Sequence, residues 1–257
     1  MTATALIVAR MGSSRLPGKS MMPILGEPLV ARLIERVERA NSVEQIVLST
    51  TTRPEDDELQ GLAEQLGVAC YRGSSEDVLG RIHGAAQQYA GDPVLEILGD
   101  NPLVHSALID DVVDFFQRGE FDYAVNVTEE FPYAEPGLAK FPIGVRVEVV
   151  SASALERCHR LATEDEFREH STAFIYTNPA LFKIGYFPAA GSWKGLSKPE
   201  LTFAVNHLEN FQLISQMFER CYPDDADFSL SKALRAFEAD PMLRPLMGAP
   251  ARNVEET

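Results

Sequence analysis

The amino-acid sequence predicts an α/β protein in which a Rossmann-like, mostly parallel sheet is flanked by helices. Residues 5–9 form a continuous apolar run, as expected of a strand buried on both faces of a parallel sheet. Residues 28–40 then carry apolar side chains at helical spacing, and Pro28 stands where a first helical turn tolerates proline. The same alternation repeats along the chain, which predicts right-handed crossovers and ligand chemistry at the carboxyl ends of the strands.

The remaining elements are placed by the same two patterns. In the first half, strands are expected at residues 45–51, 68–71 and 93–98, and helices at 54–66, 75–89 and 107–117. In the less regular second half, inserted strands are expected at 121–127, 145–150, 181–187 and 201–205, with helices at 152–161, 164–176, 208–221 and 229–238. No repeat or linker divides the chain, so we expect a single domain over residues 1–247 and a loose tail over 248–257.

The composition restricts the class of protein. A hydrophobic content of 45% suits a globular domain, and no apolar run approaches the ~20 residues of a membrane span, so we expect a cytoplasmic protein without membrane contact. A net charge of -15 argues against a nucleic-acid partner, which would favour an excess of Lys and Arg. The three cysteines are odd in number and widely spaced, so neither a disulfide framework nor a zinc pattern is expected.

The charge is unevenly distributed. The first 26 residues contain no acidic residue, although an even spread of 38 acids over 257 residues would place about four there. Arg10, Arg15 and Lys19 all lie in this segment, in a Gly/Ser/Pro-rich loop directly after the first strand. Free backbone N–H groups, the hydroxyls of Ser13 and Ser14 and three cations form a cradle suited to polyphosphate. The alternative is an ordinary surface loop.

The loop fits neither of two common phosphate-binding motifs. Five residues rather than four separate Gly12 from Gly18 before Lys19, and the nearby prolines prevent the immediate helix that a P-loop requires. A dinucleotide fingerprint is absent as well. The loop must therefore be judged on its own residues.

These residues resemble a known family. Residues 9–19 read A-R-M-G-S-S-R-L-P-G-K, which is similar to the A-R-x-x-S-x-R-L-P-G-K signature of cytidylyltransferases that make CMP-activated sugar acids. The spore coat polysaccharide biosynthesis protein F-like branch is the nearer match and CMP-KDO synthetase the more distant one. The similarity continues in residues 50–57 (T-T-T-R-P-E-D-D), 71–79 (Y-R-G-S-S-E-D-V-L), 99–103 (G-D-N-P-L) and 168–170 (R-E-H).

The resemblance implies a nucleotide-diphospho-sugar transferase type of fold and a CTP-dependent reaction with Mg²⁺ or another divalent cation. An acceptor attacks the α-phosphate of CTP, pyrophosphate leaves, and a sugar acid of the nonulosonic or KDO type is activated for surface polysaccharide biosynthesis. A homodimer is also implied. The implied catalytic residues are Arg10, Arg15, Lys19 and Asp100, with Asp100 and Asn206 as metal ligands. The implied nucleotide-binding residues are Ala9, Gly12, Ser13, Ser14, Arg72, Ser74 and Asp77, and the acceptor-binding residues are Arg146, Glu148 and His170.

Ordinary structural roles stay open at several of these positions. Asp100 follows an apolar strand, where carboxylates commonly bind a metal, but a turn aspartate also caps its own backbone. Asp77 would be equally suitable as an acid at a helix N-terminus. Arg146 would serve either an anionic acceptor or the solvent side of a strand.

The sequence also departs from the family pattern. Relatives commonly read P-D-G-x-D-V-E where residues 142–148 read P-I-G-V-R-V-E, so Ile143 and Arg146 replace two acids. Asn206 stands where a second metal-binding aspartate is expected, which removes one carboxylate from the predicted site. Two further functions therefore remain open: transfer to a phosphonate or sugar phosphate, which Arg146 permits, and nucleotide binding with weak or no catalysis, which Asn206 permits.

Overall fold

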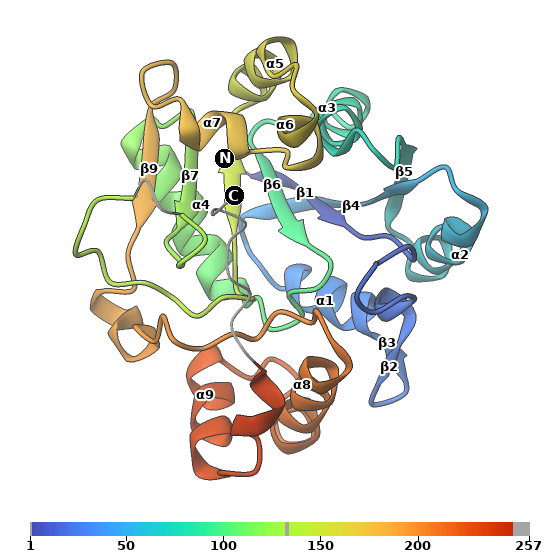
Figure 1. Ribbon diagram of the computed structural model, residues 1–257, viewed down its shortest axis with the longest axis vertical. Helices are drawn as coiled ribbons and strands as arrows, with labels where there is room; N and C mark the ends of the chain where they lie inside the picture. Colours follow the sequence, from blue (N-terminus) through green and yellow to red (C-terminus); the bar gives the residue numbers. More distant parts are fainter. Residues whose placement is uncertain (1, 132–133, 249–257) are drawn as a thin grey trace.

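The computed structural model describes residues 2–131 and 134–248, and the predicted α/β fold is confirmed (Figure 1). Seven strands form one sheet in the order β5-β4-β1-β6-β8-β7-β9. Their bounds are Ala3–Val8 (β1), Val43–Thr51 (β4), Ala69–Gly73 (β5), Val94–Leu98 (β6), Tyr123–Asn126 (β7), Glu148–Val150 (β8) and Ile184–Phe187 (β9). β8 pairs antiparallel with β6 and β7, whereas the other pairings in this sheet are parallel. The parallel strands therefore bring their carboxyl ends to one edge.

Helices cover both faces of the sheet. One face carries α1 (Leu29–Val37), α2 (Asp57–Leu66), α4 (Ser106–Gly119), α8 (Leu208–Cys221) and α9 (Leu230–Ala239), and the other carries α3 (Val78–Gln88), α5 (Ala152–Leu161), α6 (Asp165–Glu169) and α7 (Ala173–Thr177). Successive side chains of β1 alternate between the two layers, because Ala5 and Ile7 belong to one buried apolar cluster and Leu6 to the other. This two-sided burial explains the continuous apolar run in the sequence.

Short elements follow the first strand and lie between the helices. The two-stranded hairpin consists of β2 (Pro23–Ile24) and β3 (Glu27–Pro28), and the 3-10 turns are η1 (Lys19–Met21), η2 (Pro54–Asp56), η3 (Gly191–Leu196) and η4 (Arg244–Met247). Across residues 2–131 and 134–248, no helix combines the length and apolar character that crossing a membrane requires.

Two predictions of secondary structure are wrong. The strand expected at residues 201–205 is instead extended chain with a single parallel bridge, between Ile143 and Thr202, because its backbone groups bond to loops at the strand ends. The helix expected at 164–176 is divided into α6 and α7, and the hydroxyls of Ser171 and Thr172 in the break bind buried carboxylates. The predicted tail lies outside the described residues except for Gly248.

Gly144 allows two chain segments to approach closely near the strand ends. Its φ of +93° lies in the left-handed region, and a Cβ there would stand 2.2 Å from the backbone nitrogen of Ala204 and 2.4 Å from the carbonyl carbon of Phe203. Flanking hydrogen bonds, from Ile143 N to Leu201 O (3.0 Å) and from Phe203 N to Ile143 O (2.7 Å), hold the segments together. Gly144 thus determines the path of residues 201–205.

Gly144→Ala is expected to destabilise the protein by about 3 kcal/mol or more, because left-handed strain and a backbone clash act together. Gly26→Ala is the matched control, since Gly26 has a φ of +84° but a Cβ added there would meet no atom within 4 Å. Strain alone should cost the control about 1 kcal/mol. Urea denaturation would measure both values, and equal losses would show that the close approach at Gly144 is unimportant.

Candidate functional site

The loop after β1 is folded on itself through short-range hydrogen bonds. Gly18 adopts a φ of +74° and donates its N–H to Met11 O at 2.9 Å, which closes the loop just before η1. Within the loop, Ser13 Oγ accepts from Leu16 N at 3.4 Å, and Ser13 N donates to Met11 O at 2.9 Å. The compact fold places both flanks of the loop, at Arg10 and Lys19, beside the same cavity.

Asp56 anchors this loop to the neighbouring strand. Its carboxylate accepts from Met11 N at 2.7 Å and from Thr51 N at 3.3 Å, and it also accepts a hydrogen bond from the Thr51 hydroxyl. The carboxylate itself is buried, since Asp56 is only 1% exposed, and these donors supply its hydrogen bonds in place of water. The sequence interpretation missed Asp56, although its family-like segment after the second predicted strand was the available signal.

The ends of β1 and β6 approach each other at Gly99. Its N–H donates to Val8 O at 2.8 Å, and an added Cβ would lie 2.8 Å from both that oxygen and the Cβ of Ala9. A glycine is therefore required for this separation of the two strand ends. The approach places Asp100 next to the loop that follows β1.

Lys19 connects three segments of the chain. Its Nζ lies 2.6 Å from Asp100 Oδ2 and donates to Val205 O at 2.8 Å, while Val205 N donates to Asp100 O at 2.9 Å. The side chains of Lys19 and Asp100 are 13% and 21% exposed. This partial burial strengthens the ion pair relative to one at the surface and still leaves the carboxylate accessible to a ligand.

A cavity of about 290 Å³ lies over these strand ends. Eight of the predicted site residues line it, namely Ala9, Arg10, Ser13, Ser14, Arg15, Lys19, Asp100 and His170. Val8, Ser20, Val78, Arg81, Leu98, Gly99 and Glu169 complete the lining. The walls therefore carry four Arg or Lys side chains and two carboxylates, an arrangement suited to a multiply charged anion.

Arg81 is a cavity residue that the sequence interpretation missed. It lies on α3, is 2% exposed, and donates from Nη1 to Ser74 O at 2.5 Å, while its buried Nε has no partner among the described atoms. Burial, followed in importance by Arg10, lowers its pKa to about 10, so the guanidinium remains charged at neutral pH. An arginine on the face of a helix belongs to no sequence motif, and only the fold shows that this one lines the cavity.

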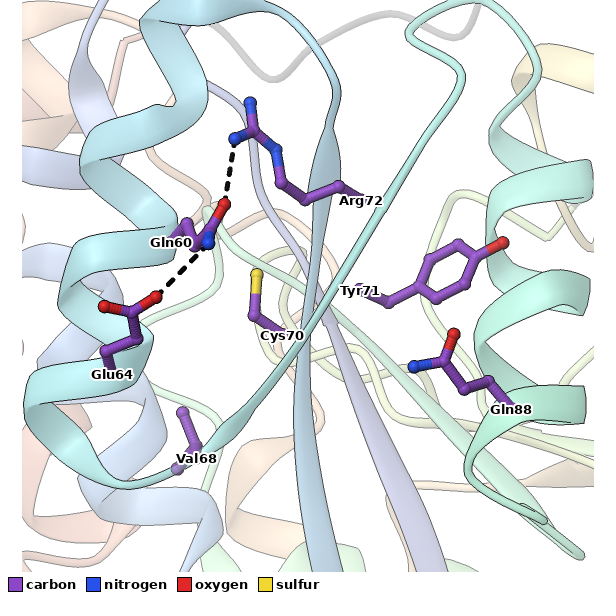
Figure 2. A pocket seen from close by; sticks show the side chains of 7 residues that line it. All are labelled: Gln60, Glu64, Val68, Cys70, Tyr71, Arg72 and Gln88. Atoms are coloured by element: carbon purple, nitrogen blue, oxygen red, sulfur yellow. Dashed lines mark hydrogen bonds between the residues drawn. The ribbon is translucent and has the colours of Figure 1, made fainter.

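Four predicted nucleotide-binding residues, Gly12, Arg72, Ser74 and Asp77, do not line the cavity. Arg72 points toward α2, as Figure 2 shows, and contributes to a separate hollow of about 420 Å³ at the β5 edge. Its guanidinium donates to Gln60 Oε1 (2.9 Å), and to Asp57, Thr51 O and Arg53 O. This set of bonds fixes Arg72 against α2.

Ser74 and Asp77 organise the start of α3. Ser74 Oγ accepts from Asp77 N at 3.0 Å, and Asp77 Oδ1 accepts from Gly80 N at 2.7 Å as the helix cap. Asp77 also pairs with Arg168; burial opposes ionisation, but the Arg168 and Gly80 hydrogen bonds outweigh it and lower the pKa of Asp77. The structure therefore shows the helix-terminal role that was the alternative at Asp77. Gly12 belongs to the loop but does not line the cavity.

Arg146 and Glu148 lie in a charge cluster at the start of β8 and do not line the cavity. Arg146 Nε lies 2.9 Å from Glu148 Oε1, and its Nη1 lies 3.4 Å from Glu130 Oε1. Burial alone would lower the pKa of Arg146, but Glu148 and Glu130 raise it overall. Since two carboxylates already face this guanidinium, the structure gives Arg146 no free charge for an anionic acceptor.

Asn206 directly follows Val205, the residue that Lys19 contacts. The preceding residue, Val205, is hydrogen-bonded to both Lys19 and Asp100, so the chain brings Asn206 to the same strand ends as Asp100. Asn206 N donates to Asn210 Oδ1 at 3.3 Å, and no contact of its own side chain is seen in the described part of the chain. Among described residues, no three His, Cys, Asp or Glu side chains cluster as a metal site.

Comparison with known proteins agrees with this arrangement. The sequence model of the family described as cytidylyltransferase matches residues 4–238. The spore coat polysaccharide biosynthesis protein SpsF of Bacillus subtilis is 27% identical over 92% of this chain and 94% of its own. The 8-amino-3,8-dideoxy-manno-octulosonate cytidylyltransferase of Shewanella piezotolerans is 28% identical over 85% of this chain and 92% of its own.

Two solved structures share the fold. A cytidylyltransferase from Leptospira borgpetersenii superposes with a TM-score of 0.84 at 24% identity, covering 96% of this chain and 98% of its own. A CMP:2-keto-3-deoxy-manno-octonic acid synthetase complexed with CTP gives a TM-score of 0.63 at 17% identity, covering 86% and 99%. At these identities, the structural comparison supports the fold alone.

Asp56→Ala is expected to destabilise the protein by about 2–3 kcal/mol, because it leaves the partly buried Met11 N–H and the buried donors of Thr51 without this acceptor. Asp57→Ala is the adjacent control, since the Asp57 side chain is 68% exposed and its ion pair with Arg72 should contribute less than about 1 kcal/mol. Thermal or urea unfolding would measure the difference. Similar losses in the two variants would contradict the anchoring role of Asp56.

Proposed function

The chain belongs to the cytidylyltransferase family, and on this basis we propose that it transfers a cytidylyl group from CTP to a sugar acid of the nonulosonic or KDO type. Membership of the family makes the protein a nucleotidyltransferase. The observation that carries the proposal is the cation-lined cavity at the strand ends, which holds Asp100 beside Arg10, Arg15 and Lys19. The named activity of the Shewanella relative supports the class of acceptor.

The reaction requires charge stabilisation more than covalent catalysis. An acceptor oxygen forms a bond to the α-phosphorus of CTP, the bond from that phosphorus to the bridging oxygen of the β-phosphate breaks, and pyrophosphate leaves with the bond electrons. The acceptor proton passes to solvent or a nearby base. Arg10 and Arg15 can bind non-bridging oxygens with two donors each, and Lys19 supplies a compact charge for the leaving pyrophosphate.

Arg81 adds a buried donor to the lining of this cavity. Its side chain is held by Ser74 O and its stem passes Gly73, where an added Cβ would lie only 2.9 Å from Arg81 Cγ. The guanidinium therefore has little freedom, and a preorganised donor loses little entropy when it binds an anion.

The residues present also suit a divalent cation. Mg²⁺ is commonly held by one or two oxygen ligands together with substrate phosphates and water, and Asp100 with Asn206 would supply a carboxylate and an amide oxygen. Such an ion would neutralise charge on the triphosphate and stabilise its leaving group. Lys19, which pairs with Asp100 in the structure, would then be free to turn toward a phosphate.

The structure weakens one alternative acceptor class. A phosphonate or sugar phosphate was suggested by Arg146, but the Arg146 guanidinium already faces Glu148 and Glu130. The carboxylate of a sugar acid would likewise have to be bound by other residues. A role in surface polysaccharide biosynthesis is in keeping with the named role of the Bacillus relative.

Pyrophosphate release would test the reaction. Purified protein with Mg²⁺ and a panel of sugar acids is expected to release pyrophosphate with CTP and much more slowly with UTP, ATP or GTP. Lys19→Met should reduce kcat by about 100- to 1000-fold, because it removes a charge from the transferred phosphates. Arg53→Met is the matched control, since the Arg53 side chain is 53% exposed outside the cavity lining. Release that is independent of CTP, or equal effects of both variants, would contradict the proposal.

Metal titration would test the ligand assignment. Asn206→Asp is expected to lower the Mg²⁺ concentration for half-maximal activity by about tenfold, because a carboxylate attracts a hard cation more strongly than an amide does. Asp100→Asn should raise that concentration. Glu209→Gln on the exposed start of α8 is a charge control, and an unchanged Mg²⁺ requirement in both site variants would show that the ion binds elsewhere.

A further inference from the structure

Two buried carboxylates face each other across strands β6 and β8. Glu96 and Glu148 are register partners, and they are 3% and 1% exposed. Two like charges at paired positions repel, and burial makes the charged forms costlier still. Burial, followed in importance by Glu148, raises the pKa of Glu96 to about 8.

The contacts of the two carboxylates differ. Glu148 receives hydrogen bonds from Tyr123 Oη and Thr172 Oγ1, both at 2.5 Å, and pairs with the Arg146 guanidinium. Glu148 thus has three side-chain partners, two hydroxyls and one guanidinium. Glu96 has a single hydroxyl partner, Ser171 Oγ, which lies 2.7 Å from Oε1 and 2.9 Å from Oε2.

The contact with Ser171 suits a protonated Glu96. A serine hydroxyl has one proton to donate, and a neutral Glu96 carboxyl supplies the donor for the second short contact. The other titratable or charged groups that face the pair come from loops, from strand β7 and from helices α3, α5 and α7: Arg81, Tyr123, Glu130, Arg146, Cys158 and Tyr176.

Both hydroxyl partners belong to the segment that separates α6 from α7. Ser171 and Thr172 directly follow Glu169 and His170, which line the cavity. His170 N donates to Glu166 O at 3.0 Å, and Ala173 N donates to His170 O at 2.9 Å, so the segment turns sharply at this point. The buried pair is therefore tethered to the cavity wall by side-chain hydrogen bonds through Ser171 and Thr172.

We propose that Glu96 and Glu148 act as positioning residues, holding the 169–172 segment through Ser171 and Thr172 so that His170 and Glu169 face the nucleotide. The catalytic consequence of this role rests on the proposed function, whereas the hydrogen bonds that hold the segment do not depend on it. It also explains why the helix expected at 164–176 is interrupted: the carboxylates draw both hydroxyls inward, a geometry that a continuous helix would not provide.

The tether depends on pH in a defined direction. Because the pKa of Glu96 is higher in the folded protein than in the unfolded chain, the folded state binds this proton more tightly, and its stability falls as the pH rises toward 8. Above that pH, Glu96 loses its proton. The two facing carboxylates then repel each other, which loosens the segment that they hold. Glutamine imitates the neutral acid and cannot ionise, so Glu96→Gln should preserve the tether and remove its pH dependence.

Amide hydrogen exchange of peptides covering residues 168–174, corrected for intrinsic rates, would test the proposal in the protein alone. Protection in the wild type is expected to fall about tenfold between about pH 6.5 and pH 9, whereas Glu96→Gln should keep the wild-type protection of about pH 6.5 at both values. Thr172→Val and Glu148→Gln should lose protection at both. Glu166→Gln, on exposed α6, is the matched control and should follow the wild type.

Two results would overturn the inference. One is a loss of protection in Glu96→Gln at about pH 6.5 that equals the loss in Glu148→Gln, because Glu96 would then need its charge. The other is wild-type protection that does not change with pH. Since exchange is measured without nucleotide, these results are independent of CTP turnover. In turnover assays, the KM for CTP of the wild type should rise over the same pH range while that of Glu96→Gln does not.

Discussion

The Lys19 ammonium is the point on which the assembly of the site depends. It lies between Asp100 and Val205 O, so it joins the loop after β1, the end of β6 and the chain that leads into α8. A charge with only 13% of its side chain exposed needs such partners, since each missing one would leave a poorly solvated ion. The cavity forms because these three segments meet there, and the close contact of Gly99 with Val8 holds the ends of β6 and β1 together.

The sequence was sufficient for the fold because burial pattern and element type agree over most of the chain. Helix α8, for example, has the bounds that its apolar spacing predicts, and β1 has the apolar run of a two-sided core. Agreement fails where a tertiary contact decides the conformation. Residues 164–176 have a helical pattern, yet the buried carboxylates of Glu96 and Glu148 interrupt it, and such partners cannot be identified from local spacing.

The site shows the same division. The loop cations and Asp100 could be predicted because they follow strands whose ends must meet at one edge of the sheet. The environment of a side chain within that edge could not be predicted. Arg72 turns toward α2 and binds Gln60, whereas Arg81, which carries no motif, lies in the cavity wall. The sequence permits Arg146 to bind an anionic acceptor, but in the fold its guanidinium forms an ion pair with Glu148.

The contact between Lys19 and Val205 also has a consequence for biosynthesis. These residues are separated by 186 positions, so a ribosome that adds about 5–20 amino acids each second needs roughly 10–40 s to supply the second partner after the first. During that interval Lys19 lacks one of its two partners, so the strand-end cavity cannot be completed until the chain that leads into α8 has been made.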